Sequence, residues 1–190
     1  MLGDVCGRGA NAAATLVRRT ARPVAPLPPD PEAVVQAVSS ALCNRPDSHG
    51  SGIVTLVYGH LTPAPNGLDI ELIRAGHTLP LILGTHHTTH TVEADGSLLG
   101  TPPDTHLRPH RLHSGPRESL LLYTDGVFEA CDTDGEQFGE ERLADAVTSA
   151  LHRPSAHDVI DALARAVRTF TGDHEIDDDQ AVLLLTATSR

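Results

Sequence analysis

The chain has 190 residues, 39% of them hydrophobic, and a formal net charge of -11 at pH 7. This length and composition predict one domain, residues 1–190, with a core of ordinary size. The acidic charge and the lack of a basic stripe argue against nucleic acid as a partner. All 14 basic residues are arginines, which excludes enzyme classes that depend on a lysine, such as P-loop NTPases, protein kinases and pyridoxal-phosphate enzymes.

The cysteines and the hydropathy pattern indicate the compartment. Cys6, Cys43 and Cys131 are scattered and form no CxxC pair. The sequence contains neither a recognisable signal peptide nor an apolar run of about 18 residues. We therefore expect a cytoplasmic protein that does not span a membrane.

The predicted elements follow in chain order. A glycine-rich opening loop leads into a helix, and a second helix begins after Asp30, which is a good N-cap before Pro31. Period-two segments then predict a hairpin and further strands, and the C-terminal part predicts two helices, the second capped by Ser155. The expected helices are 11–20, 31–42, 139–151 and one after 155; the expected strands are 53–60, 68–74, 79–83, 88–93, 107–113, 119–123 and 181–187, with a turn at 63–67. This order, with hairpin-like connections, favours an α+β fold built on antiparallel sheet.

Three acidic motifs are the candidates for chemistry. They are Gly3-Asp4-Val5-Cys6-Gly7-Arg8-Gly9, Tyr123-Thr124-Asp125-Gly126-Val127 and Asp177-Asp178-Asp179-Gln180. A carboxylate beside an apolar run or a tight turn is costly unless a cation meets it. Hard divalent cations such as Mg²⁺ or Mn²⁺ prefer oxygen ligands, which Asp4, Asp125 and Asp178 could supply.

Each motif alone has a simpler interpretation. An Asp-Gly pair is usually only a turn, and an acidic run is usually a solvated loop. The opening glycine-rich stretch could cradle a phosphate, but it lacks the spacing of a dinucleotide fingerprint and the lysine of a P-loop. Only the ordered set of motifs is informative.

The ordered set resembles the SpoIIE-like branch of the PP2C (PPM) protein serine/threonine phosphatases. The matching segments are Gly3 to Ala10, Ala75-Gly76-His77 with Pro80, Leu121 to Val127 with Glu129-Ala130, Phe138-Gly139, and Asp178-Asp179-Gln180-Ala181. Their order and spacing match from residue 3 to the end of the chain. The resemblance implies a PP2C-like αββα sandwich of antiparallel sheets flanked by helices.

The resemblance also implies a centre of two Mn²⁺ or Mg²⁺ ions. By motif, Asp4 is expected to be shared between the metals, and Val5 to bind through its backbone carbonyl. Asp125 and Asp178 are expected to bind the other metal. Gly126, Asp179 and Arg8 are expected to contact the phosphate or to support the ligands without binding metal, although a solvent-facing position is equally open for Arg8.

The implied activity is hydrolysis of phosphoserine or phosphothreonine by a metal-bound hydroxide, with no protein nucleophile. Many relatives act on phosphorylated anti-anti-sigma (STAS) proteins, so the resemblance implies a role in bacterial signalling and sigma factor regulation. The oligomeric state is open, and a dimer is compatible with the sequence. Two alternatives stay open: a catalytically weak or inactive domain that binds a phosphoprotein, and a small-molecule phosphohydrolase.

The family carries further structure before the first motif. Its members have a strand with another metal-binding aspartate, within a Gly-Asp-x-x-Asp-like motif, and a strand leading into the Gly-Asp motif. Here only Met1 and Leu2 precede Gly3. We therefore expect an N-terminally incomplete domain that lacks these strands, and the missing ligand makes its activity uncertain.

The remaining polar residues have mostly structural interpretations. Two histidine groups invite a metal interpretation, but imidazole is not the ligand that Mg²⁺ favours, so structural or solvated roles are expected. His77 is expected to be structural and Cys6 to pack, because no His-Asp pair could activate that thiol. Glu129 could reach the cleft through water or lie at the surface. The two histidine groups are His86, His87 and His90, and His106, His110 and His113.

Overall fold

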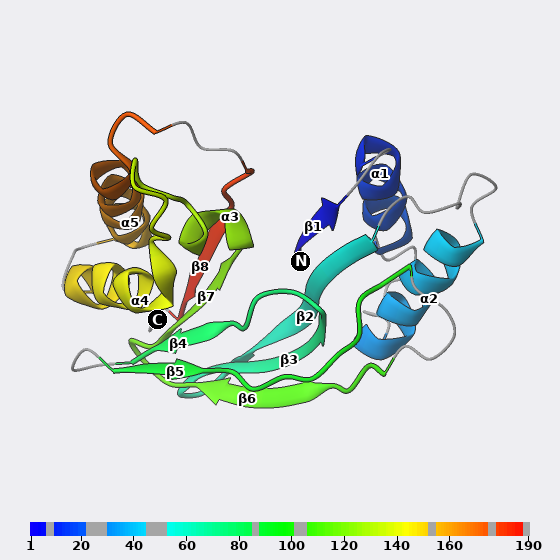
Figure 1. The fold of residues 1–190 in the computed structure, drawn as a ribbon. Helices are drawn as coiled ribbons and strands as arrows, with labels where there is room; N and C mark the ends of the chain where they lie inside the picture. Colours follow the sequence, from blue (N-terminus) through cyan, green and yellow to red (C-terminus); the bar gives the residue numbers. More distant parts are fainter. Residues whose placement is uncertain are drawn as a thin grey trace. The chain divides into compact units, whose positions relative to one another are not determined.

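The computed structural model describes residues 1–6, 10–21, 30–44, 53–84, 88–100, 106–151, 155–174 and 178–187. The chain forms two compact units (Figure 1). The first comprises Met1–Ala64, Leu68–His77 and Glu93–His113, and the second comprises Pro65–Gly67, Thr78–Val92 and Ser114–Arg190. Each unit contains helices and most of one four-stranded sheet.

The sheet of the first unit has the strand order β1-β2-β3-β6. Its strands are β1 (Leu2–Cys6), β2 (Ile53–Ala64), β3 (Gly67–Ala75) and β6 (His110–Ser114). β1 pairs antiparallel with β2, in a register that runs from Leu2 opposite Val57 to Cys6 opposite Ile53. The prediction of an opening loop was therefore wrong for residues 2–6, because pairing with β2 gives this segment hydrogen-bond partners that a local pattern does not reveal.

The hairpin of β2 and β3 is confirmed, but its turn is shorter than predicted. Pro63 and Ala64 belong to β2, and only Pro65 and Asn66 form the turn. The register of β1 reaches β2 only as far as Val57. Beyond that point one side of β2 has no pairing with β1, so a proline without an N–H is tolerated there.

Two helices cover one face of the first sheet, as the 3.6-residue pattern predicts. They are α1 (Ala10–Ala21) and α2 (Pro31–Cys43), and they pack side by side (Figure 1). The carboxylate of Asp30 accepts a hydrogen bond from the backbone N–H of Glu32 at 3.2 Å, which confirms the predicted N-cap. The core beneath these helices is aliphatic and includes Val35, Val38 and Leu56.

The sheet of the second unit has the order β5-β4-β7-β8, and its neighbours are all antiparallel. Its strands are β4 (Leu81–Leu83), β5 (Thr89–Thr91), β7 (Ser119–Tyr123) and β8 (Val182–Thr186). β4 is shorter than predicted because Pro80 has no N–H and so cannot donate to the neighbouring strand. The carbonyl of Pro80 still accepts a hydrogen bond from the N–H of Val92, at 2.7 Å. β6 likewise starts only after Pro109.

The helices of the second unit are α3 (Asp125–Phe128), α4 (Gly139–Ala150) and α5 (Ala156–Thr171). The hydroxyl of Ser155 accepts from the N–H of Asp158 at 3.2 Å, so the predicted cap of α5 is confirmed. The short helix α3 was missed, because Asp125-Gly126 was interpreted as a simple turn. α4 and α5 pack together, and with β4, β7 and β8 they enclose a second core that includes Leu121, Leu143 and Leu163.

The predicted α+β class is confirmed. The structure has two four-stranded sheets, each with its own helices and its own core. Residues 22–29, Arg8 and Asp177 lie outside the described residues. Within the described ranges, no helix is long and apolar enough to cross a membrane.

Candidate active site

The turn after β7 presents the carboxylate of Asp125. All five residues of β7 are buried, and the chain leaves the strand at Thr124, which is 4% exposed and is the N-cap residue of α3. Asp125 is therefore the first residue of that helix. A rigid strand thus ends directly at the predicted metal ligand.

One oxygen of Asp125 is unusual. Its Oδ1 atom is buried, and no described residue donates a hydrogen bond to it. A buried carboxylate oxygen without a donor is costly unless a water, a cation or another ligand satisfies it. The atom therefore fits the divalent cation that the motifs predict.

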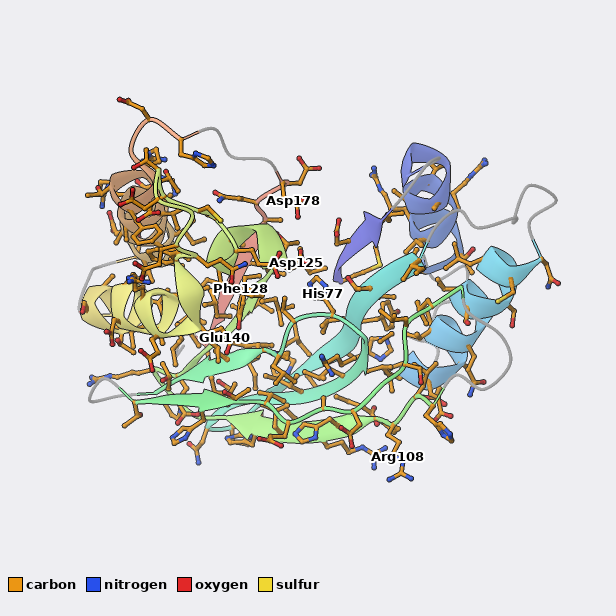
Figure 2. All side chains as sticks on the ribbon, viewed as in Figure 1. His77, Arg108, Asp125, Phe128, Glu140 and Asp178 are labelled. Carbon is orange, nitrogen blue, oxygen red and sulfur yellow. The ribbon has the colours of Figure 1, made fainter. Side chains whose placement is uncertain are left out.

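The segment before β8 lies against this turn. Asp125 and Asp178 are labelled in Figure 2 and extend from adjacent segments of the second unit. A Cβ atom added to Gly126 would lie 2.8 Å from the carbonyl oxygen of Asp179 and 3.2 Å from the Cβ of Asp178. Only glycine allows this approach without a shift, so the structure brings Asp125, Gly126, Asp178 and Asp179 together.

Side-chain hydrogen bonds connect the two segments. The hydroxyl of Thr124 donates to the carbonyl of Asp179 at 2.9 Å and accepts from the N–H of Ala181 at 2.9 Å. The amide of Gln180 donates to the carbonyl of Gly126 at 2.8 Å. Sequence alone assigns no role to Thr124 or Gln180, although each belongs to a motif that contains a predicted ligand.

Asp178 and Asp179 are both exposed and differ in their contacts. The Oδ1 atom of Asp178 accepts from the N–H of Asp179 at 2.8 Å, which fixes the orientation of one carboxylate oxygen. The backbone carbonyl of Asp179 is occupied by Thr124. Neither contact involves the carboxylate of Asp179, so the choice of Asp178 over Asp179 as a ligand rests on the motif.

Asp4 and Val5 lie on β1 in the first unit. The side chain of Val5 packs against the core under the helices, so strand alternation places Asp4 on the opposite face of that sheet. Thr55 is the register partner of Asp4, and its Oγ1 is 2.8 Å from Nδ1 of His77. Asp4 is thus half-buried beside a polar pair.

His77 is buried, with 2% of its surface exposed. Arg74 donates from Nε to the carbonyl of His77 and from a terminal nitrogen to the carbonyl of Ala94, at 3.1 Å for the latter. The Ala75-Gly76-His77 motif is therefore held by hydrogen bonds within the first unit.

The other weighed residues include Glu129, whose backbone N–H donates to the carbonyl of Asp125 at 2.9 Å, and His113 of the first unit. Glu129 is exposed, and His113 is bound to Asp69 at 2.7 Å. His86, His87, Arg8 and the side chain of Cys6 lie outside the described residues. Among the residues that the structure describes, no group of three or more His, Cys, Asp or Glu side chains is arranged to hold a metal ion.

Tyr123, just before the Asp125 turn, has a perturbed pKa. Burial, and secondarily the carboxylate of Glu140, raises the pKa of Tyr123 to about 12. Its ring also contacts Phe128 edge-on, at 6.1 Å between centroids. Tyr123 therefore stays a neutral core residue at physiological pH.

Comparisons with known proteins agree with the predicted family. The family model described as stage II sporulation protein E (SpoIIE) matches residues 1–188. A curated relative, Protein IcfG of Synechocystis sp. (strain ATCC 27184 / PCC 6803 / Kazusa), is 33% identical over 95 residues, which are 50% of this chain and 15% of IcfG. The match thus spans a small part of that relative.

Two solved structures share the fold. The SiaA-PP2C domain of Pseudomonas aeruginosa has a TM-score of 0.72 at 17% identity, with 97% of this chain and 73% of that chain covered. The RsbU and RsbW domains of Rv1364c from Mycobacterium tuberculosis give a TM-score of 0.67 at 23% identity, with 97% and 50% covered. The chain belongs to the SpoIIE family, and its fold is that of the PP2C-type serine/threonine phosphatases.

Proposed function

We propose that this chain is a metal-dependent phosphatase domain that hydrolyses phosphoserine or phosphothreonine on a regulatory protein. In this reaction water attacks phosphorus, the bond from phosphorus to the seryl or threonyl oxygen breaks, and inorganic phosphate and a protein hydroxyl are released. The proposal rests on family membership and on the carboxylates at the turn after β7.

The observation that best supports the proposal is the buried Oδ1 of Asp125, which no described residue satisfies. The bonds from Thr124 and Gln180 hold its turn against the segment that contains Asp178. Two carboxylates on adjacent, hydrogen-bonded segments are suited to a hard divalent cation.

We assign Asp4, the backbone carbonyl of Val5, Asp125 and Asp178 as the ligands of two Mn²⁺ or Mg²⁺ ions. When bound, such ions neutralise charge on the phosphoryl group and activate water for attack. Gly126 allows the ligand segments to approach, while Asp179 and Arg8 act from outside the ligand set. These roles follow from the motif match and from the chemistry of the oxygen donors.

The proposed substrate is a phosphorylated STAS-type anti-sigma antagonist. One fold relative contains RsbU and RsbW domains in a single chain, which is a property of that protein and supports a partner-switching context for this one. The net charge of -11 disfavours nucleic acid as an alternative partner.

The test is phosphate release from a phosphorylated STAS-type protein, with and without Mn²⁺. Asp125→Asn keeps the side-chain volume but removes the charge, and we expect it to lower kcat/KM by about 100-fold or more, since a metal contribution of several kcal/mol is lost. The matched control is Asp145→Asn, at an exposed position of α4, which we expect to leave the rate unchanged.

Two results would contradict the proposal. If the wild-type protein binds the phosphoprotein but releases no phosphate with Mn²⁺, the domain is a binding module. If it hydrolyses nitrophenyl phosphate and phosphorylated metabolites but not the phosphoprotein, the substrate class is wrong.

A further inference from the structure

The pairing of β7 and β8 ends shortly before Asp125, and hydrogen bonds from side chains continue to join the two segments beyond it. The backbone ladder runs as far as Tyr123 opposite Val182, and the N–H of Thr124 adds one bond to the carbonyl of Ala181 at 3.0 Å. Beyond this point the two segments no longer have strand geometry, because α3 begins at Asp125. Side chains therefore hold the segments together where the predicted ligands lie.

The hydroxyl of Thr124 is used twice. It donates to the carbonyl of Asp179 and accepts from the N–H of Ala181, so one side chain satisfies a donor and an acceptor of the opposite segment. Thr124 is buried, so loss of the hydroxyl would leave both backbone groups without this partner. The bond fixes the segment just C-terminal to Asp178.

Gln180 makes the reciprocal bond. Its Nε2 donates to the carbonyl of Gly126, at 2.8 Å and across 54 residues of sequence. The residue is exposed, so its hydrogen bond contributes little to the stability of the fold, although it fixes a specific geometry. Asp125 is therefore flanked on both sides, at Thr124 and at Gly126, by bonds to residues 179–181.

We propose that Thr124 and Gln180 are positioning residues, which hold the carboxylates of Asp125 and Asp178 at the spacing that a divalent cation requires. This inference rests on the proposed function. Mg²⁺ accepts only a narrow, near-octahedral arrangement of oxygens, and Mn²⁺ also prefers carboxylate and water oxygens, so a small displacement of either ligand weakens binding. Groups that orient ligands from outside the ligand set commonly affect metal affinity strongly.

The test compares Thr124→Val, Thr124→Ser and Gln180→Ala in the full chain. Mn²⁺ binding is measured by isothermal titration calorimetry, the free energy of unfolding by urea denaturation, and kcat and KM on the phosphorylated STAS-type protein. We expect Thr124→Val and Gln180→Ala to raise the Kd for Mn²⁺ by about 10- to 100-fold. Thr124→Ser keeps the hydroxyl and should bind Mn²⁺ like the wild-type protein.

Matched controls separate positioning from general loss of stability. Thr171→Val removes another buried threonine hydroxyl of the same unit, at the end of α5, and Gln137→Ala removes an exposed glutamine side chain. We expect both controls to bind Mn²⁺ as the wild-type protein does. In the positioning variants kcat should fall at subsaturating Mn²⁺ and recover at high Mn²⁺, while KM for the phosphoprotein changes little.

The outcomes are distinct. Wild-type affinity for Mn²⁺ in Gln180→Ala, a variant at an exposed position that should fold, overturns the positioning role even if Thr124→Val is unstable. A parallel loss of affinity in Thr171→Val also overturns it, since the effect would then follow stability alone. A wild-type protein that neither binds Mn²⁺ nor releases phosphate overturns the proposed function, and with it this inference.

Discussion

Thr55 and His77 are joined by a hydrogen bond of 2.8 Å between Oγ1 and Nδ1, across 22 residues of sequence. Thr55 lies on β2 opposite Asp4 of β1, and His77 follows the end of β3. The bond therefore connects the Ala75-Gly76-His77 motif to the strand pair that contains the first acidic motif. A buried imidazole in such a contact restricts the positions of its neighbours, both through the hydrogen bond and through packing.

We expect this pair to be coupled energetically. His77→Ala should lower the free energy of unfolding by about 2 to 4 kcal/mol, because it leaves a cavity and an unpaired hydroxyl. Thr55→Val should lower the free energy of unfolding by about 1 to 2 kcal/mol. Urea denaturation of the single and double variants should give a coupling energy of about 1 kcal/mol.

The control for this cycle is Thr62→Val, at an exposed position of the same strand, which should change stability by less than about 0.5 kcal/mol. If the effects of Thr55→Val and His77→Ala simply add, the hydrogen bond contributes nothing specific and the expectation is wrong.

Tyr123 should titrate far above its ordinary pKa. Burial, with the carboxylate of Glu140 as the second cause, raises the pKa from 10.0 to about 12. As the pH rises, the unfolded chain therefore loses this proton before the folded protein does. The stabilising contribution is complete below pH 10 and is lost between pH 10 and about 12, by up to about 2 kcal/mol.

Ultraviolet titration of phenolate absorbance in a Tyr58→Phe background isolates this group. Glu140→Gln should lower the pKa of Tyr123 but leave it above 10.0, since burial is the larger cause. A Tyr123 that ionises near pH 10.0 in the folded protein would show that its environment is much more polar than the buried position implies.

Gly126 should not tolerate a larger residue. The Cβ of Gly126→Ala would lie 2.8 Å from the carbonyl oxygen of Asp179, so the ligand segment must shift. We expect a loss of about 1 to 3 kcal/mol in the free energy of unfolding, and weaker Mn²⁺ binding by calorimetry.

Gly115→Ala is the matched control, because its added Cβ would meet only the side chain of Glu118, at 3.5 Å or more. It should change stability by less than about 0.5 kcal/mol. Equal behaviour of the two variants would mean that the segment around Asp178 adapts freely to the turn.

Local patterns predicted most of the fold. The caps at Asp30 and Ser155, the helical periods of α2 and α5 and the buried run of β7 were readable because each depends on neighbours a few residues away. β1 was missed, since a short segment that contains Gly3 and Asp4 becomes a strand only by pairing with β2. α3 was missed because the local preference of an Asp-Gly pair is the same in an isolated turn as at the start of a short helix.

By itself, the sequence determined the acidic motifs, their order, the absence of lysine and the α+β class, because residue identity and short-range periodicity decide these properties. Only the tertiary structure decided that Thr124 and Gln180 join the turn of Asp125 to the segment of Asp178. Those bonds depend on the register between β7 and β8. The register of distant strands cannot be read from local sequence patterns, since burial and hydrogen bonding across the sheet select it as the chain folds.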